Sequence, residues 1–159
     1  MAAYGVAVPE PRISLLFDFF VLNQHLRRLL TAGLAKAPLR PDEYAVYSLL
    51  FEQGPLTATE MSRRLGMPLT TVLDYLREMD RRAHLRSERH PRDGRARQLA
   101  LTVAGTSAHR ETNAHWEVVR KQLEAGLNVE SAEVWKALRA LDDAALAALA
   151  QVEAEAAAG

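Results

Sequence analysis

The sequence contains no cysteine, so the chain forms no disulfide bond and offers no thiolate to a metal ion or to redox chemistry. Aromatic residues are few, at 6%, and 20 Lys and Arg are balanced by 20 Asp and Glu, so the formal net charge is zero. A neutral total argues at first against nucleic acid as a partner, because proteins that bind it usually carry an excess of basic residues. The hydrophobic fraction of 48% is enough for a packed core and argues against a disordered chain.

Long apolar runs are also absent. The stretch from Leu15 to Leu22 is interrupted by Asp18, and the Ala/Leu run over 144–150 is far shorter than the roughly 20 residues that span a bilayer. The first residues lack the basic start and the apolar run of a signal peptide. These absences predict a soluble, cytoplasmic protein without a membrane partner.

The neutral total is a sum of two opposite local charges. Residues 60–100 hold ten arginines and six acidic residues, a balance of +4, whereas residues 130–159 hold six acidic residues against Lys136 and Arg139, a balance of −4. An asymmetry of this kind indicates a local contact with a polyanion. From charge alone, a solvated helix face of mixed charge is the simpler explanation.

The spacing of apolar residues predicts a mainly helical chain. A first helix is expected over about 14–34, because apolar residues recur there at alternating spacings of four and three. A second helix is expected from Pro41, a residue that the first turn of a helix tolerates, to the break at Gly54-Pro55. The residues expected to be buried on these two helices are Leu15, Phe19, Leu22, Leu26, Leu29, Gly33, Val46, Tyr47, Leu50 and Phe51.

Two short helices joined by a tight turn are predicted next. Thr57-Ala58-Thr59-Glu60 is a capping box that begins a helix ending at Gly66, and a further amphipathic helix runs from about Met67 to Arg82. This is the arrangement of a helix-turn-helix. An ordinary helical hairpin inside a bundle fits the same pattern.

The segment that follows favours the helix-turn-helix. Short strands are predicted over 85–89 and 98–101, joined by turn residues over 90–95 that include Asp93-Gly94. A hairpin in this place is a wing, and guanidinium groups at a wing tip bind phosphates or enter a narrow minor groove. The arginines at this tip are Arg89, Arg92, Arg95 and Arg97.

With these residues the sequence resembles the MarR family of multiple-antibiotic-resistance-type transcriptional regulators. The segment DGRARQLALT matches the wing signature of that family, D-x-R-x-x-x-x-x-L-T, through Asp93, Arg95, Leu101 and Thr102. The resemblance extends over residues 39–105, and the flanking helices also fit. It implies a ligand-responsive repressor that binds pseudopalindromic, double-stranded operator DNA as a homodimer. It further implies that Arg95 is directed at the minor groove and that Asp93 organises the wing tip.

The fold implied is mainly α with a small β-hairpin wing. Residues 1–37 would form an N-terminal arm and dimerisation helix, 38–102 the winged helix-turn-helix lobe, and 103–159 the C-terminal dimerisation helices. One small lobe cannot bury all the apolar stripes of the long helices, so we expect them to pack across a two-fold axis, with an intramolecular bundle as the alternative. The residues predicted at the dimer interface are Leu15, Phe19, Leu22, Leu123, Leu127, Leu138, Leu141 and Leu149.

The helix over 67–82 is the recognition helix that the resemblance implies. The sequence departs from the family pattern at Pro68, which replaces a capping Ser or Thr, and at Asp74, which replaces a basic residue. It also has Ala83 in place of a glycine, which would strain a turn that needs a positive φ. The residues predicted to contact DNA are Thr70, Thr71, Asp74, Arg77, Arg81, Arg82, Arg86, Arg92, Arg95 and Arg97.

A ligand site is predicted where the first, second and fifth helices approach one another. Most aromatic residues of the chain are on these helices, including Phe17 and Phe19, and the resemblance implies that a small aromatic or phenolic anion binds there. Plain core packing is the alternative interpretation. The residues predicted for the ligand are Phe20, His25, Arg28, Tyr44, Tyr47, His109 and Trp116.

No cofactor, metal site or enzymatic activity is predicted. The five histidines include no i,i+4 pair, and the chain contains no HExxH, GxSxG, GxxxxGKS/T or GxGxxG motif. The main alternative to a repressor is a winged-helix module that binds proteins and not DNA. Asp74 and the zero net charge support that alternative.

Overall fold

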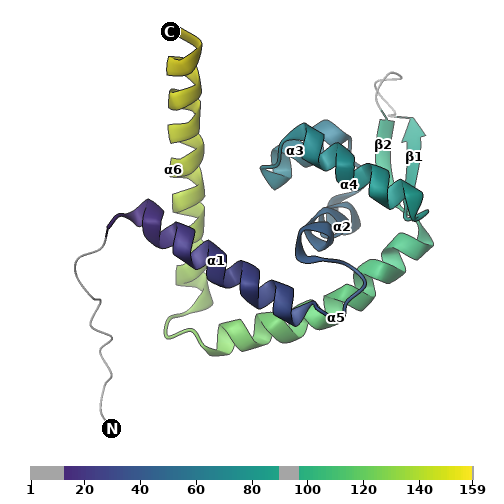
Figure 1. The fold of residues 1–159 in the computed structure, drawn as a ribbon, viewed down its shortest axis with the longest axis horizontal. Helices are drawn as coiled ribbons and strands as arrows, with labels where there is room; N and C mark the ends of the chain where they lie inside the picture. Colours follow the sequence, from purple (N-terminus) through teal and green to yellow (C-terminus); the bar gives the residue numbers. More distant parts are fainter. Residues whose placement is uncertain (1–12, 90–96, 159) are drawn as a thin grey trace. The chain divides into compact units, whose positions relative to one another are not determined.

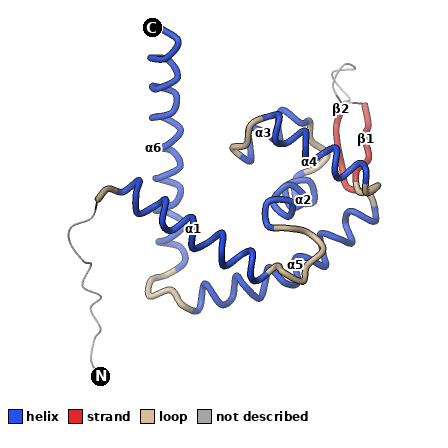
Figure 2. Tube along the Cα trace, viewed as in Figure 1, coloured by secondary structure: helices blue, strands red, loops and turns tan. Residues whose placement is uncertain are grey.

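The structure is a computed structural model that describes residues 13–89 and 97–158. In these residues the chain forms six α-helices and one antiparallel hairpin, which are labelled in Figures 1 and 2. A mainly helical fold with a small hairpin, as the sequence predicts, is therefore confirmed. The elements are α1 (Leu15–Gly33), α2 (Pro41–Gln53), α3 (Ala58–Leu65), α4 (Leu69–Arg81), β1 (Leu85–Arg89), β2 (Arg97–Leu101), α5 (Val103–Ala125) and α6 (Ser131–Ala158).

Most helix ends are set by groups that satisfy free backbone donors. At the start of α1, Ser14 Oγ accepts a hydrogen bond of 3.1 Å from the amide of Phe17. The predicted capping box of α3 is present, since the amide of Thr57 donates to Glu60 Oε2 at 2.7 Å and the amide of Glu60 donates to Thr57 Oγ1 at 3.2 Å. Gly66 ends α3 with a φ of 63°, a left-handed conformation that glycine adopts without steric cost.

The helix predicted over 67–82 is shorter at both ends. Pro68 occupies the N-cap position of α4 and makes no side-chain cap hydrogen bond, as expected for a residue without a hydroxyl group. The helix ends at Arg81, and Arg82 is its C-cap. The start of α4 therefore lacks the side-chain support that α1 and α3 have.

The centre of the lobe built from α2, α3, α4 and the hairpin is α2. It packs against α3, α4 and β2, and removal of its apolar side chains from water stabilises the lobe. The sequence predicts Phe51 in the buried stripe of α2, but it is 39% exposed. One face of its ring stacks on His109 of α5. The side chains that are buried most completely in the chain are Tyr47, Leu39, Met61, Met79, Val46, Val72 and Thr112.

The hairpin is tied to the helices by a short additional strand pairing. Strands β1 and β2 pair along their full length, with Leu85 opposite Leu101. The amide of Leu56 donates to the carbonyl of Leu99 at 3.0 Å, and the amide of Leu99 donates to the carbonyl of Leu56 at 2.8 Å. These two bonds join the wing to the segment between α2 and α3. A single bridging residue has no periodicity, so the sequence did not indicate it.

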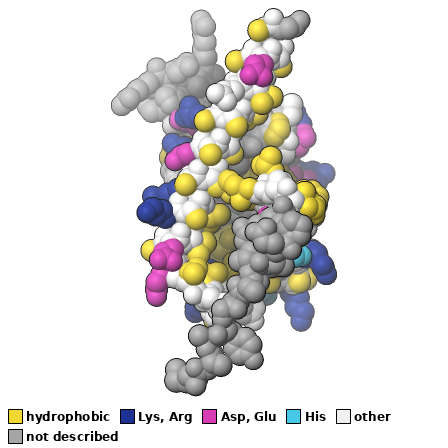
Figure 3. Space-filling model, turned by 90° about the vertical axis from the view of Figure 1, so that its left-hand side faces the viewer, with side chains coloured by type: hydrophobic (Ala, Val, Ile, Leu, Met, Phe, Trp, Pro, Cys, Tyr) yellow, Lys and Arg dark blue, Asp and Glu magenta, His cyan; other side chains and the backbone are white. Residues whose placement is uncertain are grey.

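The chain divides into two compact units, Met1–Val119 and Arg120–Gly159. Neither α1, in the first unit, nor α6, in the second, has a residue that is buried within the chain. The burial predicted for the apolar face of α1 is thus not reached within a single chain: Leu15 is 66% exposed and Phe19 is 47% exposed. Hydrophobic side chains are spread over the surface seen in Figure 3. No helix in residues 13–89 and 97–158 is long and apolar enough to cross a membrane.

Candidate DNA-binding surface

One face of α4 is polar and open to solvent. Val72, Leu76 and Met79 are buried in the lobe, whereas the opposite face is exposed. Spacings of three and four place side chains on the same side of a helix, so this face forms one continuous strip. The strip consists of Thr70, Asp74, Arg77 and Arg81.

The charged groups of this strip are paired with each other along the helix. Arg77 binds Asp74, with side-chain exposures of 72% and 73%, and Arg81 binds Glu78. An exposed pair such as Arg77–Asp74 contributes about 0–1 kcal/mol to stability, so Arg77 can exchange its carboxylate for a phosphate or a base at small cost. Glu78, the partner of Arg81, is 26% exposed. Thr71, the remaining predicted contact on α4, is partly buried beside the strip.

The basic excess of residues 60–100 does not lie on α4 itself. Three acidic residues, Asp74, Glu78 and Asp80, outnumber the two arginines of Leu69–Arg81, so the helix has a balance of −1. Two exposed arginines that sequence reasoning missed, Arg63 and Arg64, stand in the last turn of α3. Their signal was an adjacent basic pair directly before the turn of the helix-turn-helix.

The strands of the wing hold further arginines, Arg86 near the base of the hairpin and Arg97 at its loop end. Arg97 Nε donates to Ser87 Oγ at 2.6 Å, and Arg86 Nε donates to the carbonyl of Leu101 at 3.3 Å. Arg86 also binds Glu88. These bonds hold both guanidinium groups along the strands. The predicted wing-tip residues Arg92, Asp93 and Arg95 lie outside the described residues, so their roles stay predictions.

A groove of about 470 Å³ runs between α3, α4 and the hairpin. Its apolar wall includes Leu73, Leu76 and Leu99, and its polar wall includes Arg77 of α4 and Arg97 of β2. Helix α4 and the hairpin therefore border a common concave surface.

Arg82, predicted as a phosphate contact, forms ion pairs with Glu43 of α2 and Glu78 of α4, and its role at DNA stays a prediction. Its Nη2 donates to Oε1 of Glu43 at 3.0 Å, and its Nε donates to Oε1 of Glu78 at 2.7 Å. Glu43 is only 4% exposed and also accepts from the amide of Arg40 at 2.9 Å and from Arg40 Nη2 at 3.2 Å. The side chain turns inward because this buried carboxylate attracts it more strongly than solvent does.

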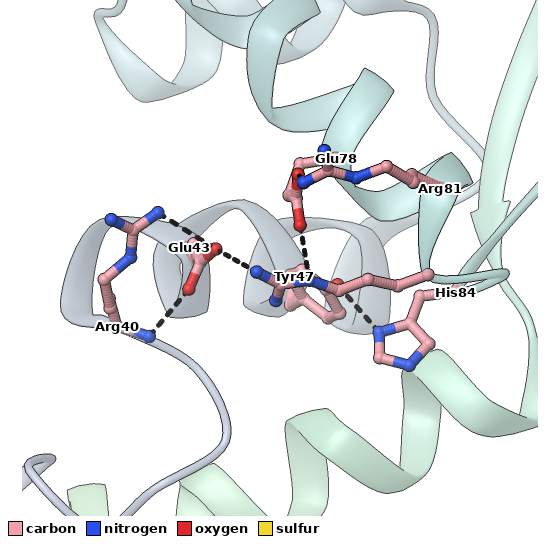
Figure 4. Close-up of polar contacts among 7 residues, drawn as sticks. Arg40, Glu43, Tyr47, Glu78, Arg81 and His84 are labelled. Carbon is pink, nitrogen blue, oxygen red and sulfur yellow. Dashed lines mark hydrogen bonds and ion pairs between the residues drawn. The ribbon is translucent and has the colours of Figure 1, made fainter.

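A second contact joins α2 to the end of α4. The hydroxyl of Tyr47 lies 2.9 Å from Nδ1 of His84 (Figure 4). Burial lowers the pKa of His84, and the charge of Arg82 lowers it further, whereas burial raises the pKa of Tyr47. The imidazole is therefore neutral at neutral pH, and we assign the phenol as the donor to Nδ1.

Glu43 stays ionised in this network. Burial, the largest effect, would raise the pKa of its carboxyl group, but hydrogen bonds from Arg40 and the charges of Arg82 and Arg40 outweigh burial. The pKa of Glu43 is therefore below its usual value. The carboxylate is a fixed negative charge under α4.

The turn between α4 and β1 is also held by Thr102 and by the start of α5. Ala83 has a φ of 55°, which confirms the strained backbone predicted for a non-glycine residue there. Thr102 Oγ1 donates to the carbonyl of Ala83 at 2.8 Å, and the amide of Thr102 donates to the carbonyl of His84 at 3.0 Å. A Cβ atom on Gly105 would lie 2.4 Å from that same carbonyl oxygen, so the start of α5 packs directly against the turn.

Three of the residues predicted for a ligand do come together. The rings of Tyr44 and His109 are stacked with their centroids 5.2 Å apart, and Trp116 lies 4.9 Å from Tyr44. Phe51 covers the other side of His109 at 4.3 Å. His109 Nε2 lies 3.1 Å from Ser48 Oγ, while its buried Nδ1 has no hydrogen-bond partner. Tyr44, Phe51, His109 and Trp116 are called the aromatic cluster below.

The other predicted ligand residues lie elsewhere. Tyr47 is in the core of the lobe, where its hydroxyl meets His84. Phe20, His25 and Arg28 are exposed on α1. Helical spacing put them on the same helix as the expected site, but it did not specify which face of α1 meets α5. Among residues 13–89 and 97–158, no three His, Cys, Asp or Glu side chains are grouped so as to hold a metal ion.

Comparison with known proteins identifies the fold. No protein-family model and no curated protein matches the chain. The regulator MosR of M. tuberculosis, in complex with DNA, is similar with a TM-score of 0.73 and 20% identity, over 85% of this chain and 98% of MosR. A MarR variant from E. coli, complexed with operator DNA, has a TM-score of 0.72 and 19% identity, over 81% and 94% of the two chains.

A third solved structure adds a ligand. The PcaV transcriptional regulator of Streptomyces coelicolor, in complex with its natural ligand, has a TM-score of 0.70 and 24% identity, over 86% of this chain and 99% of PcaV. The chain described here therefore has the winged-helix fold of MarR-type transcriptional regulators.

Proposed function

We propose that the protein is a DNA-binding transcriptional regulator that reads operator DNA with α4 and contacts the backbone with the wing. The observation that supports this most directly is the exposed strip on α4, which is bordered by the wing in a winged-helix fold. A helix of this kind fits the major groove, where hydroxyl, carboxylate and guanidinium groups reach base edges. Two of the similar structures, MosR and the MarR variant, contain DNA.

The residues of the surface divide into two roles. Thr70, Thr71 and Asp74 are short and uncharged or acidic, so we assign them to base edges. The arginines are assigned mainly to phosphates, which fix the register of the protein on DNA without specifying its sequence. The arginines with this role are Arg63, Arg64, Arg77, Arg81, Arg86, Arg92 and Arg97, whereas Arg95 is assigned to the minor groove.

The active form is proposed to be a homodimer that acts as a repressor at pseudopalindromic sites. Leucine and phenylalanine side chains on α1 and α6 are exposed in the single chain, and such surfaces mark protein interfaces. Two lobes related by a two-fold axis would read half-sites one helical turn apart, about 34 Å. The DNA expected to contain such a site is the region upstream of the protein's own reading frame.

A binding isotherm on that upstream DNA, repeated across a salt series, tests the proposal. Selective binding with a steep negative slope of log K against log salt supports a regulator that neutralises several phosphates. Absence of binding at low salt would exclude it and would favour the protein-interaction module, for which the −1 balance of α4 is the supporting observation. A random duplex of the same length is the control for selectivity.

An effector is proposed to bind at the aromatic cluster and to release the DNA. Burial lowers the pKa of His109, which favours a neutral ring. We assign the tautomer in which Nε2–H donates to Ser48 Oγ, so that Nδ1, which has no hydrogen-bond partner among the described residues, accepts from a ligand. A phenol or a phenolic acid supplies both that donor and a ring that stacks on Tyr44 or Phe51. Preference for the released state by about 1–3 kcal/mol would weaken DNA binding by roughly 5- to 150-fold.

A thermal-shift screen of phenols and aromatic acids, combined with a DNA-release assay, tests the effector. A true effector should raise the melting temperature and displace the operator. His109→Gln should abolish both effects, whereas His115→Gln on the same helix should leave them unchanged. Equal loss in both variants would place the ligand somewhere else.

A further inference from the structure

The recognition helix is held unequally at its two ends. At its start, Pro68 provides no side-chain cap, and Leu69 is 41% exposed. At its end, Arg82 binds Glu43 of α2, and His84 meets Tyr47 of α2. Among the described residues, the bonds with Glu43 and Tyr47 thus tie the second end of α4 to the central helix of the lobe, whereas the N-cap of α4 makes no side-chain hydrogen bond.

The tie at the end of α4 is geometrically specific. The carboxylate of Glu43 accepts three hydrogen bonds, two from Arg40 at 2.9 and 3.2 Å and one from Arg82 at 3.0 Å. Glu43 is 4% exposed, so water cannot replace a lost partner easily. Its bonds with Arg40, drawn in Figure 4, fix it to the first turn of α2. Arg82 then joins the end of α4 to the same carboxylate.

Two adjacent arginines have opposite surroundings. Arg81 has a side chain that is 76% exposed and binds Glu78 on its own helix. Arg82 has a side chain that is 33% exposed and bridges two helices through Glu43 and Glu78. The positive charge is the same, but the guanidinium of Arg81 is bound to one carboxylate of its own helix and faces solvent, whereas that of Arg82 is held between two helices.

We propose that Glu43 and Arg82 are positioning residues, which set the angle and register of α4 for operator recognition without contacting DNA. This inference rests on the proposed function. Base readout needs side chains at defined positions, whereas binding to random DNA needs mainly charge. Loss of the tie should therefore reduce selectivity for the operator and leave random binding unchanged.

The experiment compares Arg81→Gln with Arg82→Gln, two neighbouring substitutions that remove the same charge. Dissociation constants are measured for the upstream operator and for a random duplex over a salt series. Arg81→Gln should weaken both by the same factor and reduce the salt slope by about 1. Arg82→Gln should weaken the operator by about threefold to thirtyfold, with random binding and its salt slope unchanged.

A second variant separates positioning from instability. The double substitution Glu43→Gln and Arg82→Gln removes both charges, so no unpaired carboxylate stays buried, and the melting temperature should lie near that of the wild type. It should still show the reduced ratio of operator to random binding. Arg82→Lys keeps the charge without the planar fork and should give partial rescue.

Three results would overturn the inference. Equal weakening of random and operator DNA in Arg82→Gln would make Arg82 a phosphate contact. An unchanged ratio in the folded double variant would show that the tie does not position α4. Absence of selective binding by the wild type is a different failure, because it excludes the regulator itself along with the role of the pair.

Discussion

Asp74 and Arg77 pair within one helical turn on the exposed strip of α4. Because the pair is exposed, it adds little to stability, and both groups are available to DNA. A carboxylate only accepts hydrogen bonds, for example from the N4 amino group of cytosine, and it repels phosphates. Asp74 should therefore shape base preference while it weakens binding to random DNA.

Replacing Asp74 with asparagine should change both properties. The amide removes a negative charge from the strip and can donate as well as accept, which suits adenine. We expect random duplex to bind about threefold to tenfold more tightly at low salt, with altered preference at one base pair of each half-site. Titrations against operators with single base-pair changes measure this. Glu133→Gln on α6 removes the same charge and should change neither the affinity for random duplex nor the base preference. If Asp74→Asn gives the same two values as Glu133→Gln, Asp74 has no part in base readout.

Gly105 provides a test of packing at the turn that follows α4. An added methyl group would lie 2.4 Å from the carbonyl oxygen of His84, so Gly105→Ala must displace the turn. We expect the free energy of unfolding to fall by about 1–3 kcal/mol, as for other overpacked sites. Gly126→Ala is the control, because its added methyl group meets no atom closer than 3.5 Å. Denaturant unfolding compares the two, and equal stabilities would mean that the turn is loose.

At the scale of elements, α2 has two sets of contacts. Within the aromatic cluster, Tyr44 and Phe51 of α2 stack on His109 of α5. Glu43 and Tyr47 join α2 to the end of α4 through Arg82 and His84. A ligand that separates the rings of the cluster would therefore displace the helix that supports α4. We expect the binding of an effector to change the position of the recognition helix through this displacement of α2.

The histidines beside α2 predict a pH dependence of stability. Burial lowers the pKa values of His109 and His84 below 6.5, so the folded chain binds fewer protons than the unfolded chain near that pH. Stability should be complete above about pH 6.5 and should fall as the pH drops through the folded pKa values. Melting temperatures from pH 8 to 5 measure the slope. His109→Phe should reduce the slope without abolishing it, because His84 still titrates; an unchanged slope would contradict the assignment.

The elements were more predictable than the contacts between them. The capping box of α3, the turn at Gly66 and the strained Ala83 are local signals, and all three are present. Arg82 and Glu43 are 39 residues apart, and an arginine after a helix looks the same in sequence whether it faces water or a buried carboxylate. The pairing of Leu56 with Leu99 could not be predicted either, because a single bridging residue produces no periodic pattern in the sequence.

At the scale of the whole molecule, the charges of opposite sign are separated along the chain. The basic excess lies in residues 60–100, and the acidic excess lies in residues 130–159, a segment that includes α6. The helices α1 and α6 expose leucine, phenylalanine and tryptophan side chains that a monomer would leave in water. Pairing of two chains would bury these side chains and would present two basic segments to one duplex.

Leu149→Asp should disrupt the proposed dimer. Leu149 is 52% exposed on α6, so the folding of a single chain does not depend on its burial. A charge placed inside an apolar interface between two chains is costly. We expect the mass measured by light scattering to fall to that of one chain, with helix content unchanged. Gln151→Asp adds the same charge to the same helix and serves as the control. A wild-type mass for Leu149→Asp would remove this residue from the interface.

The start of α4, which has no side-chain cap, bears on how strictly each base pair of an operator must be kept. If α4 reads operator DNA as proposed, base pairs beside Thr70 would meet the end of the helix whose N-cap, Pro68, makes no side-chain cap hydrogen bond. Base pairs beside Arg81 would meet the end that Arg82 ties to α2. We therefore expect natural operators to vary more at the positions beside Thr70 than at those beside Arg81.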